Sequence, residues 1–391
     1  MYDDFFFPYD RAKLWTKNMV LLSLSHFLLY VSLYAMLPAL PVWLVQQWSC
    51  SYSVAGTVVA VFGPAMFLPG AFNSYLIDAF RRKNVCLASM LLLVITLWLY
   101  PHAGALWLIL FMRLLQGALF GVITMTTGST LVIDVTVSRR RTEANVAFAW
   151  VGRLGMAAGL VLGIYIYPYW DFIYIIYTGA VLTALAWLML IPVGVSFRAP
   201  LNPPLLSLDR FLLPRALCPA VNMMLVSFIF GVIISHIYNE LFYICTLIGL
   251  LVALSLSRWA FRDEDGRAQM ELGLAALAGG LLLLNYSHGL FNSYVAALLI
   301  GTGIGLAVSH FFIRIIRLPM HCERGTGNNT YQLMWELGIL AGFWFENMWA
   351  ENYPDTIYWI CIAVCVLVEL MYEGFTHSWC LKRDRRQMLN N

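Results

Sequence analysis

Long hydrophobic stretches alternate with short polar connections along the whole chain. A helix that crosses the roughly 30 Å hydrocarbon core of a membrane needs about 20 mostly apolar residues. The hydrophobic stretches approach or exceed this length, so we predict an all-α membrane protein with twelve transmembrane helices. The predicted spans are residues 16–46, 52–77, 84–101, 104–134, 143–167, 171–192, 216–239, 241–261, 268–287, 291–316, 325–350 and 354–381.

The predicted span at 325–350 carries a carboxylate near its middle. Glu336 lies within the otherwise membrane-like run TYQLMWELGILAGFWFENMW. A charged side chain at this depth costs about 2.5 to 3.5 kcal/mol on insertion scales, so it faces a partner or a water-filled path. We therefore predict that Glu336 points into the helical bundle.

The composition agrees with a membrane protein. Apolar residues make up 61% of the chain and charged residues only 12%, against about 25% charged residues in soluble domains. The eight cysteines are scattered without metal-site spacing. The sequence also lacks an HExxH pair, a nucleophile elbow and a phosphate-binding loop. We therefore expect no enzyme activity, no cofactor and no metal.

The Lys and Arg residues indicate the orientation. All but two of the 24 lie in the N-terminal segment, in or beside the connections after even-numbered spans, or in the C-terminal tail. The positive-inside rule then places both termini in the cytoplasm. The two exceptions, Arg113 and Arg153, fall within spans. Because the basic residues report topology, we expect contact with a lipid bilayer and no nucleic-acid partner.

Residues 193–215 form a long Pro-rich connection with several arginines and no hydrophobic run. We predict a cytoplasmic linker here, between an N-terminal six-helix bundle (1–192) and a C-terminal six-helix bundle (216–391). The bundles are internal repeats, because an offset of 183 aligns identical residues. The aligned pairs are Arg141 with Arg324, Asn145 with Asn328, Gly155 with Gly338, and Gly159 with Gly342. An offset of 184 aligns Gly117 and Gly121 with Gly301 and Gly305.

The offset of 183 also places Arg153 opposite Glu336. Equivalent positions of the two bundles thus carry opposite charges in mid-span. Two interpretations are open: the two groups flank a central cavity, or each is neutralised by a neighbouring helix and holds the bundle together.

Three sequence motifs are similar to those of the major facilitator superfamily. SYLIDAFRRKNV, between spans 2 and 3, resembles the signature GxLADRxGRR and matches it at Leu76, Asp78, Arg82 and Lys83, whereas Ser74, Ala79 and Arg81 depart from it. FRDEDGR, between spans 8 and 9, is a weaker copy with Asp263, Gly266 and Arg267 in register. RLLQGALFG in span 4 resembles the pattern RxxQG and places Arg113 on its membrane-embedded arginine.

This resemblance covers essentially the whole chain and implies a transporter that works by alternating access. It places spans 1, 4, 7 and 10 around a central cavity, with spans 5 and 11 beside them. It also implies a gate, in which Asp78 lies near the N-terminus of span 11 and locks the outward-facing state. The gating residues are then Asp78, Arg82, Lys83, Asp263 and Arg267. The alternative is that these residues only anchor their loops.

Span 5 bears on the branch of the superfamily. Its GMAAGLVLGI resembles the GxxxGPxxGG pattern of proton-driven exporters, keeping Gly155, Gly159 and Gly163 but placing Leu160 where Pro is expected. PALPVWL in span 1 and ERGTGNNTY before span 11 are closest to the bacterial drug and sugar efflux branch. The resemblance therefore implies a multi-pass protein of the bacterial cytoplasmic membrane, although the missing Pro weakens the case for antiport.

Polar side chains follow one face of several predicted spans, at helical spacing. Because such stripes turn away from lipid, we expect them to line the cavity. The substrate-cavity candidates are Tyr30, Tyr34, Gln116, Asn328, Tyr331, Gln332 and Trp335. The proton-coupling candidates are Glu336, with Arg113 and Arg153 setting its charge or holding an anionic substrate group, and His26, which either titrates or only packs.

The sequence thus predicts a secondary transporter that exports a small amphipathic organic molecule in exchange for protons. Proton-coupled or facilitated uptake of a sugar or similar nutrient is the second possibility. A membrane receptor or membrane enzyme is the third. We expect a monomer whose partners are protons, a small-molecule substrate and the bilayer.

Overall fold

Helices make up most of the described chain in the computed structural model. The structure describes residues 13–195, 202–207, 210–261, 266–287, 289–319 and 324–390, with the backbone alone at 324 and 384–390. Eleven helical segments among the described residues are long and apolar enough to cross a membrane. A twelfth helix, α15 (Arg324–Trp349), has a sufficient length of 26 residues but is more polar. The predicted all-α membrane fold is confirmed.

The first six spans contain short breaks that the sequence analysis did not predict. Pro38 separates the two helices of span 1, and Pro64 and Pro69 interrupt span 2, because proline lacks the N–H that continues a helix. A π-helical turn at Thr127–Leu131 interrupts span 4. The helices are α1 (Lys17–Met36), α2 (Ala39–Trp48), α3 (Tyr52–Ala60), α4 (Phe62–Ala65), α5 (Asn73–Ala79), α6 (Arg82–Leu99), α7 (Leu106–Thr126), α8 (Val132–Asp134), α9 (Arg141–Ile166) and α10 (Phe172–Leu190).

The last six spans are more regular. Asn239 caps the start of one of them, since its side chain accepts a hydrogen bond from the Phe242 N–H at 3.1 Å. A π-helical turn at Tyr372–Thr376 divides the last span. The helices are α11 (Leu217–His236), α12 (Glu240–Trp259), α13 (Arg267–Tyr286), α14 (Leu290–Arg317), α15, α16 (Ile357–Met371) and α17 (His377–Asn390).

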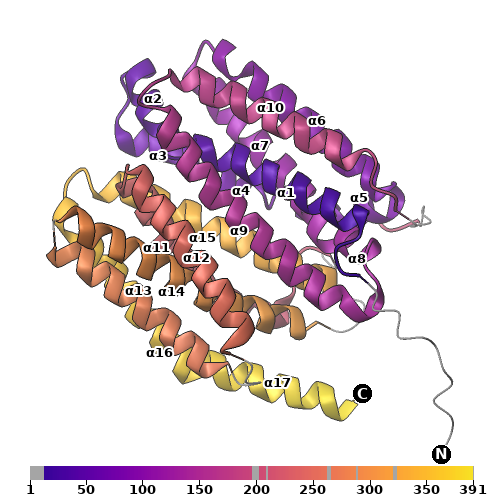
Figure 1. Cartoon of the computed structure of the whole chain (residues 1–391). Coiled ribbons are helices and arrows are strands. Elements are labelled where there is room, and N and C mark those ends of the chain that lie inside the picture. The colour runs from indigo at the N-terminus through magenta and orange to yellow at the C-terminus, as the bar shows by residue number, and fades with distance from the viewer. Residues whose placement is uncertain are drawn as a thin grey trace, which may run out of the picture.

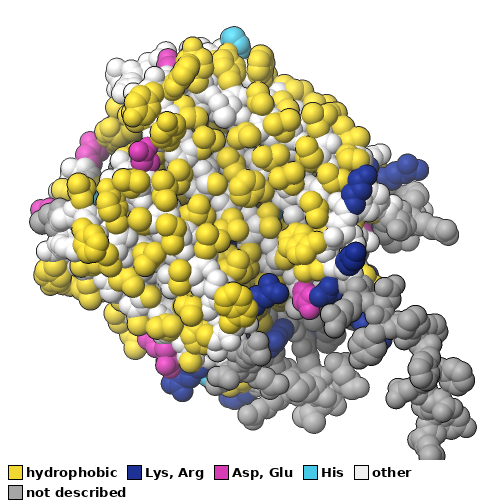
Figure 2. Space-filling model, viewed as in Figure 1, with side chains coloured by type: hydrophobic (Ala, Val, Ile, Leu, Met, Phe, Trp, Pro, Cys, Tyr) yellow, Lys and Arg dark blue, Asp and Glu magenta, His cyan; other side chains and the backbone are white. Residues whose placement is uncertain are grey.

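The two sets of helices lie side by side (Figure 1). Helices α5, α8 and α17 lie at one end of the molecule, and α2 and α3 lie at the other. Figure 2 shows Lys and Arg side chains gathered at the first end, while hydrophobic side chains cover the long face between the ends. We call the first end the basic end. The opposite end, whose connections carry Asp171, Glu240, Glu351 and Asp355, is called the acidic end.

The helix bounds reproduce the internal repeat. Helices α9 and α15 both have 26 residues, and each bound of α15 is 183 higher than that of α9. Arg153 and Glu336 therefore occupy the same position in the two helices. The start of α14 is likewise 184 higher than the start of α7. The division of the chain at 193–215 stays a prediction.

Close packing fixes the position of α1, which carries part of the predicted cavity face. A Cβ atom added at Gly159 of α9 would lie 2.7 Å from the Val31 carbonyl oxygen and 3.0 Å from the Tyr34 Cβ. On another side of α1, the Ser32 hydroxyl donates to the Gly179 carbonyl of α10 at 2.7 Å. Small residues at such contacts let helix backbones approach closely in membranes. Helix α1 is thus held against both α9 and α10.

An ion-pair network lies at the basic end of the first bundle. Arg82 donates to both carboxylate oxygens of Asp134, at 3.1 and 2.9 Å, and lies 3.5 Å from Asp78. The second oxygen of Asp78 lies 3.1 Å from the Arg210 Nε. The resemblance placed Asp78 near the N-terminus of span 11, whereas the ion-pair partners that the structure gives it are Arg82 and Arg210.

Residues 210–213, which lie in the predicted linker, contact helices of both predicted bundles. The Phe211 ring packs edge-on against Phe67 of span 2, with centroids 5.8 Å apart. The Phe211 carbonyl accepts from the Asn329 side chain at 2.8 Å, and the Leu213 N–H donates to the Thr330 hydroxyl at 2.8 Å. Because Asn329 and Thr330 belong to α15, the segment 210–213 ties span 2 to span 11.

The remaining gating candidates have local partners. Lys83 donates to the carbonyls of Ile191 and Val193, at 2.5 and 2.9 Å. Arg267 pairs with Glu271 and Glu373, at 3.0 and 2.5 Å. Asp263 lies outside the described residues. These contacts fit the anchoring alternative as well as a gate.

Replacing Gly159 with Ala should separate α1 from α9. We expect a loss of about 1 to 3 kcal/mol in stability, the usual effect of overpacking a tight contact, measured as a lower melting temperature in detergent. Gly279→Ala is the control, because a Cβ there meets nothing within 4 Å. It should stabilise by about 0.5 to 1 kcal/mol, since Ala favours a helix over Gly. Equal effects of the two changes would contradict the packing argument.

Replacing Arg82 with Gln should leave two poorly exposed carboxylates without their shared cation. Breaking one partner out of a buried ion pair costs about 3 to 5 kcal/mol, so the melting temperature should fall clearly. The neighbouring Arg81 is exposed, and Arg81→Gln should change stability by less than about 0.5 kcal/mol. If both variants melt alike, the network does not stabilise this state.

Candidate substrate and proton site

Glu336 is held by hydroxyl and amide groups rather than by a cation. Its Oε1 accepts from the Tyr30 hydroxyl at 3.0 Å and from the Gln332 amide at 3.0 Å, and its Oε2 accepts from the Tyr34 hydroxyl at 2.6 Å. Gln332 also donates to the Tyr30 hydroxyl. Glu336 is only 2% exposed, and the described residues give it no ion-pair partner. The structure thus brings together four residues predicted from two separate polar stripes.

These hydrogen bonds cross from one bundle to the other. Tyr30 and Tyr34 lie on α1, whereas Gln332 and Glu336 lie on α15. The two tyrosine rings stack with centroids 5.8 Å apart and planes 10° apart, which orients both hydroxyls toward the same carboxylate. Hydrogen bonds to a charged group contribute about 1.5 to 3 kcal/mol each. The Glu336 carboxylate therefore joins α15 to α1 by hydrogen bonds.

Arg153 does not contact Glu336, although the two positions are equivalent in the repeat. Its Nε and Nη2 donate to the Tyr331 hydroxyl at 3.1 and 2.9 Å, and its Nη1 donates to the Ser309 hydroxyl at 2.8 Å. The guanidinium also lies over the Trp150 ring, 4.8 Å from its centroid. Arg153 is thus held by hydrogen bonds to neighbouring helices, and the described residues give it no carboxylate partner.

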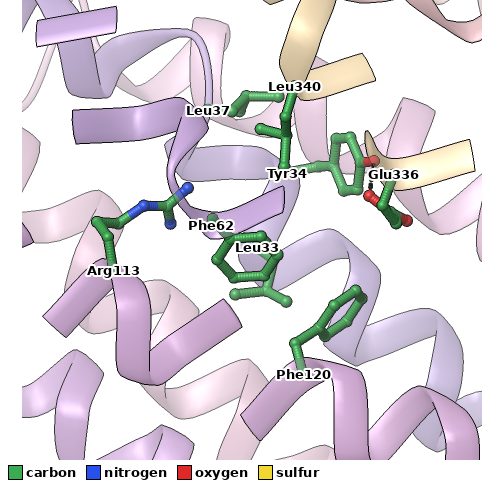
Figure 3. Close-up of a pocket in the computed structure, with 8 residues that line it drawn as sticks. All are labelled: Leu33, Tyr34, Leu37, Phe62, Arg113, Phe120, Glu336 and Leu340. Carbon is green, nitrogen blue, oxygen red and sulfur yellow. Dashed lines mark hydrogen bonds between the residues drawn. The ribbon is translucent and has the colours of Figure 1, made fainter. Parts of the chain in front are cut away.

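A small cavity lies next to Glu336, between spans 1, 2, 4 and 11 (Figure 3). Its volume is about 20 Å³, which is enough for about one water molecule. Three predicted residues line it, namely Tyr34, Arg113 and Glu336. The other lining residues are Leu33, Leu37, Phe62, Phe120 and Leu340, which sequence reasoning missed because apolar side chains in a span carry no signal that separates a cavity wall from ordinary packing.

Arg113 faces this cavity, and no carboxylate of the described residues pairs with it. Its Nη2 donates to the Val59 carbonyl at 3.0 Å and its Nη1 to the Gln116 side-chain oxygen at 3.4 Å. Its guanidinium lies 4.7 Å from the centroid of the Phe62 ring. The buried Nε–H has no partner among the described residues. Arg113 is therefore a buried cation, 4% exposed, without a direct counter-charge in the part of the chain that the structure describes.

The remaining predicted residues lie around this site but not in the cavity wall. His26 stacks on Phe148, with ring centroids 3.9 Å apart, and its Nδ1 has no described partner. Trp335 is buried with its ring centroid 6.5 Å from that of Phe230 on α11. Asn328 lies two helical turns nearer the basic end. His26 thus packs beside Tyr30 rather than beside Glu336.

The bundles touch on the acidic side of Glu336. A Cβ atom added at Gly56 of α3 would lie 2.5 Å from the Asn347 Cβ of α15. The Trp344 indole N–H donates to the Thr57 hydroxyl at 3.1 Å. These contacts join spans 2 and 11 between the cavity and the acidic end.

The bundles also touch on the basic side. A Cβ atom added at Gly128 would lie 2.5 Å from the Asn328 Nδ2, and one added at Gly325 would lie 2.6 Å from the Ser129 carbonyl oxygen. Both contacts join the π-helical turn of span 4 to α15. Spans are thus in contact on each side of Glu336, and the cavity next to it has room for about one water molecule.

Comparisons with known proteins agree with this architecture. The family model described as Major Facilitator Superfamily matches residues 22–343. A comparison with curated protein sequences finds no match. Among solved structures, the crystal structure of a D-xylose–proton symporter is similar with a TM-score of 0.71 and 13% identity, over 91% of this chain and 97% of that one. A mutant form of the nucleoside transporter NupG is similar with a TM-score of 0.64 and 15% identity, over 91% of this chain and 99% of that one.

At these identities the solved structures support the fold alone, whereas the family model covers most of the chain. The family also accounts for the twelve spans, the repeat of α9 in α15, and the buried polar site between the bundles. This chain belongs to the major facilitator superfamily of secondary transporters.

Proposed function

We propose that this transporter is proton-coupled and that Glu336 carries the coupling proton. The observation that supports this most is the set of hydrogen bonds that the Glu336 carboxylate accepts across the bundle interface, from Tyr30 and Tyr34. A side chain that binds a proton can control a conformational change only if one protonation state makes contacts that the other loses. Glu336 can meet this condition because two of its three hydrogen-bond partners, Tyr30 and Tyr34, belong to the opposite bundle.

The ionised carboxylate accepts hydrogen bonds on both oxygens, whereas a protonated one has a donor O–H and less capacity to accept. Protonation also removes the charge that makes such bonds strong. We infer that ionised Glu336 favours the closed arrangement and that protonated Glu336 favours separation of α1 from α15. Proton binding and opening are then linked, which is what drives alternating access with a proton gradient.

The first candidate function that we propose is proton antiport, in which a small amphipathic molecule is exported. Its support is the similarity of spans 1, 5 and 11 to the bacterial efflux branch, including Gly159, which packs against α1. With this function we propose a location in a bacterial cytoplasmic membrane, with the basic end inside. Antiport requires that substrate and proton compete for the site.

Proton-linked co-transport is the second candidate. Leu160 stands where the exporters' span 5 pattern has Pro. In addition, Arg113 is buried in the wall of the same cavity as Glu336, and the described residues give it no carboxylate partner, so the site carries positive charge that does not compete with a proton. Co-transport requires that substrate and proton bind together.

The two candidates differ in the direction of proton flow when a solute is added outside sealed proteoliposomes. A dye that reports internal pH should show acidification for co-transport and alkalinisation for antiport, tested with amphipathic cations, sugars, amino acids and organic acids. Glu336→Gln should abolish the solute-induced pH change in either case. Glu143→Gln is the matched control, because that side chain is 59% exposed. A proton flux that survives in Glu336→Gln rules out Glu336 as the coupling group.

A further inference from the structure

We propose that Arg113 binds an acidic group of the substrate, and that the transported molecule is an amphipathic organic anion. This rests on the proposed function, because it names the substrate class of the same site. The argument uses the hydrogen bonds of Arg113, the charges buried around the cavity, and the shape of the cavity wall.

Arg113 has donor capacity left over. A guanidinium carries five N–H donors, and the described contacts of Arg113 are one backbone carbonyl, one amide oxygen and the face of Phe62. Its Nε–H is buried without a partner. A buried cation that lacks a counter-ion is destabilising, and a neutral side chain could fill the same space at lower cost. The cost is explained if the counter-ion is the cargo.

The buried charges near the cavity do not balance. Arg113, Arg153 and Glu336 are each less than 5% exposed, so the set carries one excess positive charge even when Glu336 is ionised. Arg153 already donates to Tyr331 and Ser309, and it is not part of the cavity wall. The excess charge that is open to a ligand is therefore the one on Arg113.

The cavity wall specifies the rest of the ligand. Arg113 and Glu336 lie on opposite sides of the cavity in Figure 3, with side chains of Leu33 and Phe62 between them, and Phe120 also lines the cavity. A carboxylate can bind a guanidinium through two parallel hydrogen bonds. The apolar part of such a ligand would pack against the leucine and phenylalanine side chains as the bundles open. One cation and an apolar wall favour a monoanion with a hydrophobic body.

This ligand class has a consequence for coupling. A bound anion near Glu336, in a medium of low dielectric constant, repels the ionised carboxylate and favours its protonated form. By linkage, protonation of Glu336 favours anion binding by the same factor. Anion and proton then bind cooperatively, which favours co-transport over antiport.

The test is a binding measurement on the purified full-length protein. The melting temperature is measured at increasing concentrations of benzoate, phenylacetate and octanoate. The uncharged benzamide, phenylacetamide and octanamide are tested in the same way. Any ligand that binds the native state raises the melting temperature. At least one acid should stabilise the protein, and its amide should not. Arg113→Gln should weaken the acid at least tenfold, Arg113→Lys should keep part of the binding, and the exposed Arg258→Gln should leave it unchanged.

A second readout does not depend on the choice of acid. If Arg113 is kept for a ligand, the ligand-free Arg113→Gln protein should melt at the same temperature as the unmodified protein or higher. A fall of several degrees would show that Arg113 stabilises the fold and would overturn the proposal. It is also overturned if no acid of the panel binds, if the amides bind equally well, or if binding survives in Arg113→Gln.

Glu336→Gln separates this inference from the proposed function. That variant mimics the protonated side chain, so it should bind the acid at least as well as the unmodified protein while losing solute-driven proton flux. If its proton flux persists but binding depends on Arg113, the coupling role of Glu336 fails and the substrate class stands. If flux depends on Glu336 but binding ignores Arg113, the substrate class fails and the coupling role stands.

Discussion

The carboxylate of Glu336 has to be satisfied in a place where no bulk water can do it. It meets this constraint with donors from both bundles, two tyrosine hydroxyls of α1 and one amide of its own helix. The packing of the surrounding helices holds those donors in place. The contact of Gly159 with Val31 and Tyr34 sets the position of α1, so a glycine on a neighbouring helix helps to position the hydroxyl of Tyr34. The hydrogen bonds to Glu336 thus depend on the packing of α1 against α9.

Charges near the cavity are handled in two different ways. Arg153 donates through all three of its nitrogens, to a tyrosine and a serine, and lies over an aromatic ring, which is the arrangement expected of a group that stabilises helix packing. Arg113 has weaker and fewer partners and faces the cavity. The arginines of two adjacent spans therefore have different surroundings. Arg153 is held by hydrogen bonds between helices, whereas Arg113 faces a cavity. Neither setting could be assigned from residue type alone.

The fold was predictable from sequence because span length and charge position are properties of short segments. The repeat offset of 183 was also visible, and it holds for the bounds of α9 and α15. Sequence reasoning grouped Gln332 with Glu336 and Tyr30 with Tyr34 correctly, since helical spacing determines which residues share a face. It did not predict the breaks in spans 1, 2 and 4, because the effect of a proline or a π-helical turn depends on neighbouring helices.

The features of the site that could not be predicted from the sequence depend on contacts between distant segments. Equivalence in the repeat suggested that Arg153 and Glu336 flank one cavity, yet the partners of Arg153 come from α14 and α15. Asp78 pairs with Arg210 of the linker, a contact that no local pattern specifies. The apolar cavity wall, including Phe62 and Phe120, has the same composition as the surrounding core.

The contacts of residues 210–213 mean that the predicted linker does more than join the two predicted bundles. Its segment 210–213 contacts span 2 through Arg210 and Phe211, and α15 through the Phe211 carbonyl and the Leu213 N–H. Parting the bundles at the basic end costs these contacts, so they add to the free-energy gap between the closed and open states. Each 1.4 kcal/mol of that gap changes the ratio of the two populations about tenfold. Sequence changes in a loop far from any substrate can therefore set how often the transporter opens.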